Sequence, residues 1–166
     1  MKKILLFLML IAPVAAFAQK FGHVRSMEIV TILPEYEKAQ KDMQAMQTMY
    51  EDEMKRTADE MKKKYKEFQE DKDKLSENIL ARRQQELQEL NDKAIQFQQD
   101  AQQNLQKKYN ELMEPILKKV EEAIKAVGQE GGYVYIFDLN SVNIPWVNNQ
   151  LSDDVTAKIK KKLGLK

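Results

Sequence analysis

Between Pro34 and Val127 the chain contains no glycine, and Pro115 is the only proline after Pro34. Glycine and proline are the residues that most often interrupt helices, so this composition predicts helices of unusual length. At 1.5 Å of rise per residue, two arms made from this stretch would each extend on the order of 60–70 Å, several times the length of an ordinary globular helix. We therefore expect a helical arm over residues 34–127.

The first half of this stretch carries one narrow apolar stripe. Its apolar residues recur in steps of three and four, with an additional four-residue step near Met54, as in a coiled coil with a stutter. A helix that is charged on all its other faces pairs along one seam and meets water elsewhere. The stripe consists of Tyr36, Ala39, Met43, Met46, Tyr50, Met54, Ala58, Met61, Tyr65, Phe68 and Leu75.

The second half carries a matching stripe, which predicts an antiparallel hairpin with its tip within Asp71–Asn78. Such a hairpin sets Phe68 opposite Leu87, and Met61 opposite Ala94. We expect Pro115 to break and bend the returning helix and Gly128 to cap it. The returning stripe consists of Leu80, Leu87, Leu90, Ala94, Phe97, Ala101, Leu105, Tyr109, Leu112, Ile116, Val120, Ile124 and Val127.

Residues 1–18 have the pattern of a secretory signal peptide. Lys2 and Lys3 precede the apolar run 4–11, and Ala16 and Ala18 give the small residues of a cleavage site after Ala18. The run is too short to span a bilayer. The alternative is an uncleaved anchor, whereas a lipid anchor would need a cysteine and the sequence has none. Cleavage would change the formal net charge from +1 to −1 and leave a chain without a membrane anchor.

The segments that flank the arm predict a small body of strands and short helices. Residues 19–33 contain an alternating strand pattern over 21–25 and a brief helix that Ser26 would cap. Residues 128–166 contain a dense strand signal over 133–137 and a second, edge-type signal over 144–147. Ser152, Asp153 and Asp154 would cap a last helix. The predicted fold class is α+β, and the open edges of so small a sheet predict an oligomer.

Residue types that carry chemistry are scarce in this chain. His23 is the only histidine, there is no cysteine, and Asp138, Asp153 and Asp154 occur in turn and cap contexts. No phosphate-binding loop, nucleophile motif or metal-ligand spacing occurs. We therefore expect a non-enzyme without cofactor or metal. The balanced charge and the export signal argue against nucleic acid as a partner.

The order of these segments resembles the Skp (OmpH) family. The resemblance is carried by the signal peptide, the short strand, the Pro-Glu-Tyr-x-Lys-Ala opening of the hairpin at Pro34, and the returning strand that ends in Phe137-Asp138. It implies a periplasmic chaperone that holds unfolded outer-membrane proteins. It also implies a homotrimer whose strands close a small β-barrel, with the hairpins projecting around a cavity. We expect the oligomer body to involve Phe21, Val24, Tyr133, Tyr135 and Phe137.

Apolar arm residues that lie off the seam are the candidates for contact with a client protein. These candidates are Met49, Ile79, Ile95 and Met113. Methionine is flexible and polarisable and suits surfaces that bind many partners. Met43, Met46, Met54 and Met61 are better interpreted as seam residues that fill the hairpin.

The charge of the arm departs from that of the best-known family members, which are strongly basic and have been linked to lipopolysaccharide binding. Residues 51–110 contain 13 Lys and Arg against 14 Asp and Glu. Where the basic members are rich in arginine, this chain has the uncharged run 101–104. Lipopolysaccharide binding is therefore doubtful for this chain.

Three functions are compatible with the pattern. The first is an ATP-independent holdase chaperone. The second is a coiled-coil adaptor of the cell envelope, although the lipoyl-like domain and membrane anchor of such adaptors are missing from the pattern. The third is a ligand-binding module in which Trp146, Tyr133 and Tyr135 line a pocket in the body.

Overall fold

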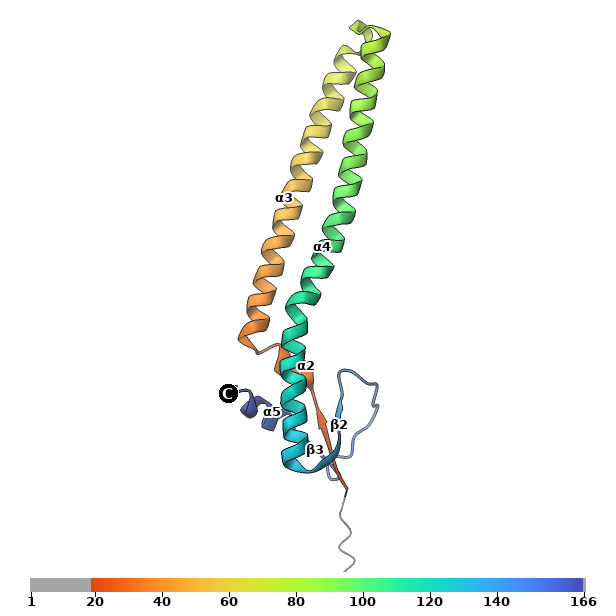
Figure 1. The fold of residues 1–166 in the computed structure, drawn as a ribbon. Coiled ribbons are helices and arrows are strands. Elements are labelled where there is room, and N and C mark those ends of the chain that lie inside the picture. Colours follow the sequence, from red (N-terminus) through yellow and green to blue (C-terminus); the bar gives the residue numbers. More distant parts are fainter. Residues whose placement is uncertain (1–18, 166) are drawn as a thin grey trace, which may run out of the picture. The chain divides into compact units, whose positions relative to one another are not determined.

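The computed structural model of the protein describes residues 19–165, so the predicted signal peptide and its cleavage site lie outside the described residues. The elements are shown in Figure 1. In chain order they are β1 (Lys20–Val24), α2 (Ser26–Val30), α3 (Pro34–Asp71), the 3-10 helix η2 (Lys72–Lys74), α4 (Glu77–Gly131), β2 (Tyr133–Asp138), β3 (Ser152–Asp154) and α5 (Thr156–Lys162). The fold is α+β, as predicted.

The described residues divide into two compact units. The arm unit is residues 27–121. The body unit combines residues 19–26 with residues 122–164, so that the chain leaves the body after its first strand and re-enters it near the end of α4.

The arm unit is an antiparallel hairpin of α3 and the first part of α4 (Figure 1). Pro34 occupies the first turn of α3, where its missing N–H costs nothing, and Glu35 and Glu37 follow it at the positive helix end. The chain reverses through η2 and Leu75, inside the predicted tip. The long helices and their reversal therefore confirm the hairpin prediction.

The body unit contains a three-stranded parallel sheet in the order β2-β1-β3. The first strand lies in the centre, with Phe21 opposite Tyr135 on one side and Ser152 on the other. Val24, Val155 and Ile159 are fully buried and form the core of this unit. The predicted strand over 133–137 is thus confirmed as β2.

Two predictions about the C-terminal region are wrong. Residues 144–147 do not form a strand, because Pro145 lacks the N–H that strand pairing requires. The third strand is instead Ser152–Asp154, which pairs with β1, and of the predicted cap residues Asp154 also bonds to the start of α5. Val155 occupies the cap position of α5 without a side-chain bond, although the Asp154 carboxylate accepts a hydrogen bond from the Thr156 N–H at 2.9 Å.

The predictions for the returning helix also need correction. Helix α4 continues unbroken through Pro115, because Met113 and Ile116 on either side of the proline are buried in the arm and hold both turns in place. It also continues past Gly128. The positive φ of 65° that ends such a helix occurs at Gly132, where a residue without Cβ meets no steric penalty.

Asp138, the last residue of β2, connects three segments of the body. Its carboxylate accepts hydrogen bonds from the Ser26 N–H at 3.2 Å and the Ser26 hydroxyl at 2.6 Å. It also accepts from the Asn140 N–H at 3.1 Å and the Ser141 hydroxyl at 2.6 Å. Burial alone would raise the pKa of Asp138, but the hydrogen bonds from Ser141 and Ser26 outweigh it and lower the pKa below 3.8.

Replacement of this carboxylate tests its role as a connector. We expect Asp138→Asn to lower the free energy of unfolding of the body by about 2–3 kcal/mol at pH 7, because an amide cannot accept all of these bonds. A group whose pKa is lowered in the folded state stabilises above its ordinary value near 3.8 and loses that contribution as the pH falls through the lowered value. Urea unfolding from pH 7 to pH 2.5 should therefore show a smaller acid-induced loss in the variant.

The matched control is Asp100→Asn on the exposed surface of α4, where, among residues 19–165, the carboxylate accepts a hydrogen bond only from Gln96 on the same helix. It should leave the unfolding curve unchanged at both ends of the pH range. Equal effects of the two substitutions would contradict the connecting role of Asp138.

Candidate functional site

The seam between α3 and α4 has the predicted pairing. Phe68 and Leu87 line one shared cavity, and Met61 and Ala94 line another. The rings of Tyr50 and Phe97 meet edge to face, with centroids 5.7 Å apart and planes inclined by 65°. Ala101 is nearly fully buried. The seam therefore holds the hairpin together without a wide core.

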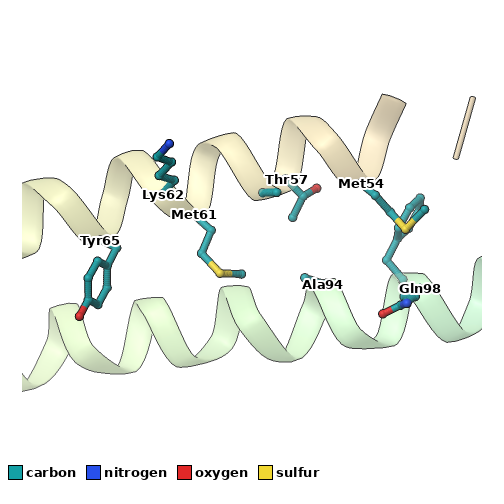
Figure 2. Close-up of a pocket in the computed structure, with 9 residues that line it drawn as sticks. Met54, Thr57, Met61, Lys62, Tyr65, Ala94 and Gln98 are labelled. Carbon is teal, nitrogen blue, oxygen red and sulfur yellow. The ribbon is translucent and has the colours of Figure 1, made fainter. Parts of the chain in front are cut away.

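The seam is incompletely filled in the middle of the arm. A cavity of about 470 Å³ lies between the two helices, and its lining contains little polar surface. Figure 2 shows Met61 and Tyr65 pointing from α3 toward α4, where Ala94 offers only a methyl group. The cavity is lined by Met54, Thr57, Ala58, Met61, Lys62, Tyr65, Ala94, Phe97 and Gln98.

This cavity coincides with the stutter in the heptad pattern. Met54, Ala58 and Met61 follow steps of four and three, and Ala58 and Ala94 are too small to fill the space between the helices. The stutter is visible in the sequence, but the cavity is not. The signal that could have revealed the cavity is the coincidence of the stutter with an alanine on each arm.

Three of the four predicted client-contact residues are exposed. Met49 has 57% of its surface exposed, and Ile79 and Ile95 are also on the surface of the arm. Met113 is only 6% exposed and lines a seam cavity with Tyr36 and Ala39. The expectation that Met113 lies off the seam is therefore wrong, because Met113 adjoins the seam residue Leu112 and lines the same cavity against α3.

Charges on the arm are neutralised locally. Ion pairs join residues three or four apart on the same helix, as in Lys41–Glu37 at 2.6 Å and Arg82–Glu86 at 3.0 Å. The hydrogen bond from Arg82 lowers the pKa of Glu86, and the one from Lys41 lowers the pKa of Glu37. One pair, Lys119–Glu35, joins the two helices at their base. Exposed ion pairs of this kind contribute little to the stability of the folded protein.

The body unit exposes aromatic residues on one face of its sheet. The rings of Phe21 and Tyr135 are nearly parallel and stack with their centroids 6.4 Å apart. The centroids of the Tyr135 and Phe137 rings are 5.8 Å apart. A cavity of about 380 Å³ lies beside them, with Phe21, Phe137 and Trp146 in its lining. Tyr135 and Phe137 are exposed, and Trp146 is 74% exposed. We call Phe21, Tyr135, Phe137 and Trp146 the aromatic sheet face.

Tyr133 differs from the other aromatic residues of β2 because it faces charged groups. Its hydroxyl donates to Asp153 at 2.6 Å, and the Lys20 ammonium lies 4.3 Å from its ring centroid. The hydrogen bond from Tyr133 is the main reason that the pKa of Asp153 is lowered, and Lys158 and Lys20 add to the effect. Tyr133 therefore connects β2 to β3 rather than forming part of the aromatic sheet face.

His23 is buried in the central strand. Its Nδ1 lies 3.0 Å from the Ser152 hydroxyl, and its Nε2 lies 3.9 Å from the Asp154 carboxylate. Within residues 19–165, no group of three or more His, Asp or Glu side chains is arranged to hold a metal ion. None of the helices in the same range is long and apolar enough to cross a membrane.

The sequence model of the family described as outer membrane protein (OmpH-like) matches residues 20–163. The chain belongs to the OmpH-like family. The match includes both the sheet of the body and the whole hairpin. No curated protein matches this sequence.

A solved structure supports the same fold. The chain is similar to a structure from Caulobacter crescentus described as that of a proposed outer membrane chaperone (OmpH-like). The TM-score is 0.69 and the sequence identity is 13%, with 89% of this chain and 88% of that chain covered. At this identity the likeness shows a shared OmpH-like fold.

The contrast between Met49 and Met113 gives a direct test of the arm surface. Met49→Ser should reduce binding of an unfolded β-barrel protein and leave the melting temperature unchanged, because the side chain is exposed. Met113→Ser should lower stability by about 2–4 kcal/mol, because it removes buried apolar volume from the seam. The measurements are thermal unfolding by circular dichroism and client binding by fluorescence. A lower melting temperature for Met49→Ser would place that residue in the seam.

Proposed function

We propose that the protein is an ATP-independent holdase chaperone that binds unfolded outer-membrane β-barrel proteins and prevents their aggregation. The observation that supports this proposal most is membership of the OmpH-like family over residues 20–163. The Caulobacter crescentus structure of the same fold is described as a proposed outer membrane chaperone. The arm surface is consistent with such a role.

Weak binding at many points follows from the composition of the arm. Met49, Ile79 and Ile95 are exposed apolar side chains, separated along the hairpin by charged and amide residues. Each contact would contribute little, but several together would hold an unfolded chain with useful affinity. A client held by separate, weak contacts can also be released without an energy source.

We also propose that three copies assemble through their body units, as the family resemblance implies. Parallel sheets in proteins are normally covered on both faces. Here β2 is largely exposed, and Tyr135, Phe137 and Trp146 present a large apolar surface to solvent. Contact between copies would cover the aromatic sheet face. Val24 is already fully buried and Tyr133 is held by charged groups, so these two residues support the body from within.

The proposed place of action is the periplasm, reached with the signal peptide of residues 1–18 and without a remaining membrane anchor. Clients would be attracted mainly by their apolar groups, because the arm carries no net excess of charge and most of its charges are paired along each helix. The same balance makes lipopolysaccharide a doubtful partner.

The function is tested by diluting an outer-membrane β-barrel protein from urea into buffer that contains the purified protein. We expect light scattering from client aggregates to be suppressed near one trimer per client, without ATP. Bovine serum albumin at the same mass concentration is the control. Aggregation that proceeds equally in both solutions would reject the chaperone function.

A second test addresses the assembly on which the cage depends. Phe137→Asp should reduce the mass of the particle toward that of one chain, because contact between copies would bury the new carboxylate at a cost of several kcal/mol. Val142→Asp places the same charge at an exposed position in the loop after β2 and serves as the control. An oligomer that survives Phe137→Asp unchanged would remove the aromatic sheet face from the interface.

A further inference from the structure

We propose that the mid-arm cavity binds an aromatic side chain from an extended segment of the client. In that segment, a residue next to the aromatic one carries a carboxylate. This inference rests on the proposed function and assigns one of its contacts to a defined place. The cavity is the space between α3 and α4 next to Met54, Met61 and Ala94 (Figure 2), and Phe97 also belongs to its lining.

The size of the cavity suits an aromatic ring together with part of its backbone. An enclosed apolar cavity of about 150 Å³ is sufficient to bind benzene; the mid-arm cavity has about 470 Å³ and is open to solvent along one side, where Ala58 and Tyr65 are exposed. Ala58 and Ala94 create this space without breaking either helix. A ring can therefore enter the cavity while the contacts between α3 and α4 on either side of it along the arm stay in place.

The lining of the cavity favours an aromatic occupant. Met54 and Met61 contribute thioether sulfurs, which make favourable contacts with ring edges. Phe97 and Tyr65 add ring faces and edges against which a further ring can pack. Methionine side chains have several rotatable bonds, so the same cavity can adjust to phenylalanine, tyrosine or tryptophan.

Charge complementarity adds the requirement for a neighbouring carboxylate. Lys62 is the only charged residue in the lining, and Figure 2 shows its ammonium pointing away from α4. The lysines that follow it are paired: Lys63 with Glu67, Lys64 with Glu60, and Lys66 with Glu70. Lys62 has no such partner among residues 19–165. Its four-carbon stem is flexible, so that a change of side-chain torsions brings the ammonium to an acid beside the bound aromatic residue.

The site can be tested with two short peptides and methyl NMR of the methionines. We expect N-acetyl-Phe-Asp-amide to shift the methyl signals of Met54 and Met61 by ring currents, and to leave that of Met27 in place. N-acetyl-Phe-Lys-amide should bind at least threefold more weakly. Equal shifts at Met49 and Met54, or none at millimolar peptide, would overturn the proposal.

Two variants extend the test. Ala94→Leu fills the cavity and should abolish the shifts, whereas Ala81→Leu on the exposed surface of the same helix should preserve them; melting temperatures verify that both fold. Lys62→Glu should reverse the preference between the two peptides. An Ala94→Leu variant that binds peptide as the parent does would also overturn the proposal.

The client assay separates this site from the general function. Ala94→Leu should weaken the binding of an unfolded β-barrel protein at least threefold relative to Ala81→Leu, and unchanged binding would reject the assignment of the cavity to clients. Failure of the parent protein to bind any client would instead reject the chaperone function, whatever the peptides show.

Discussion

Each long helix of this protein has one narrow apolar stripe, and a helix of that kind is stable only against a partner that buries the stripe. The hairpin meets this requirement with its own second arm, so that Met61 and Ala94 line a shared cavity and Tyr50 contacts Phe97. The other faces of both helices remain in water, and they carry charged side chains that form ion pairs such as Lys41–Glu37. The arm thus offers a large surface and a thin core, which suits transient contacts better than tight binding.

The sheet of the body depends on the arm in a different way. Parallel strands cannot be joined by a tight turn and need a long connection, and here that connection between β1 and β2 includes the whole hairpin. Ser26 and Asp138 form their hydrogen bonds across 112 positions of sequence. Because distant segments pair slowly, the hairpin should form before the sheet. Burial of the aromatic sheet face would complete the structure in the proposed trimer.

The sequence predicted the elements that depend on local patterns. The strand over 133–137, the proline at the start of α3 and the tip of the hairpin follow from composition and periodicity. The failures concern positions that distant contacts decide. Ser152–Asp154 reads as a helix cap, but pairing with the central strand makes it β3. Met113 lies off an ideal heptad, but packing against Tyr36 and Ala39 of α3 buries it. The mid-arm cavity depends on two alanines whose approach no single helix reveals.

In the proposed function, a trimer holds one unfolded client between its arms. The most direct measurement is the mass of the purified protein by multi-angle light scattering, alone and after mixing with an unfolded outer-membrane β-barrel protein. We expect the mass of three chains for the protein alone, and the mass of three chains plus one client in a soluble complex after mixing. A stable trimer that leaves the client to aggregate would contradict the chaperone function, and a monomer would contradict the assembly through the aromatic sheet face.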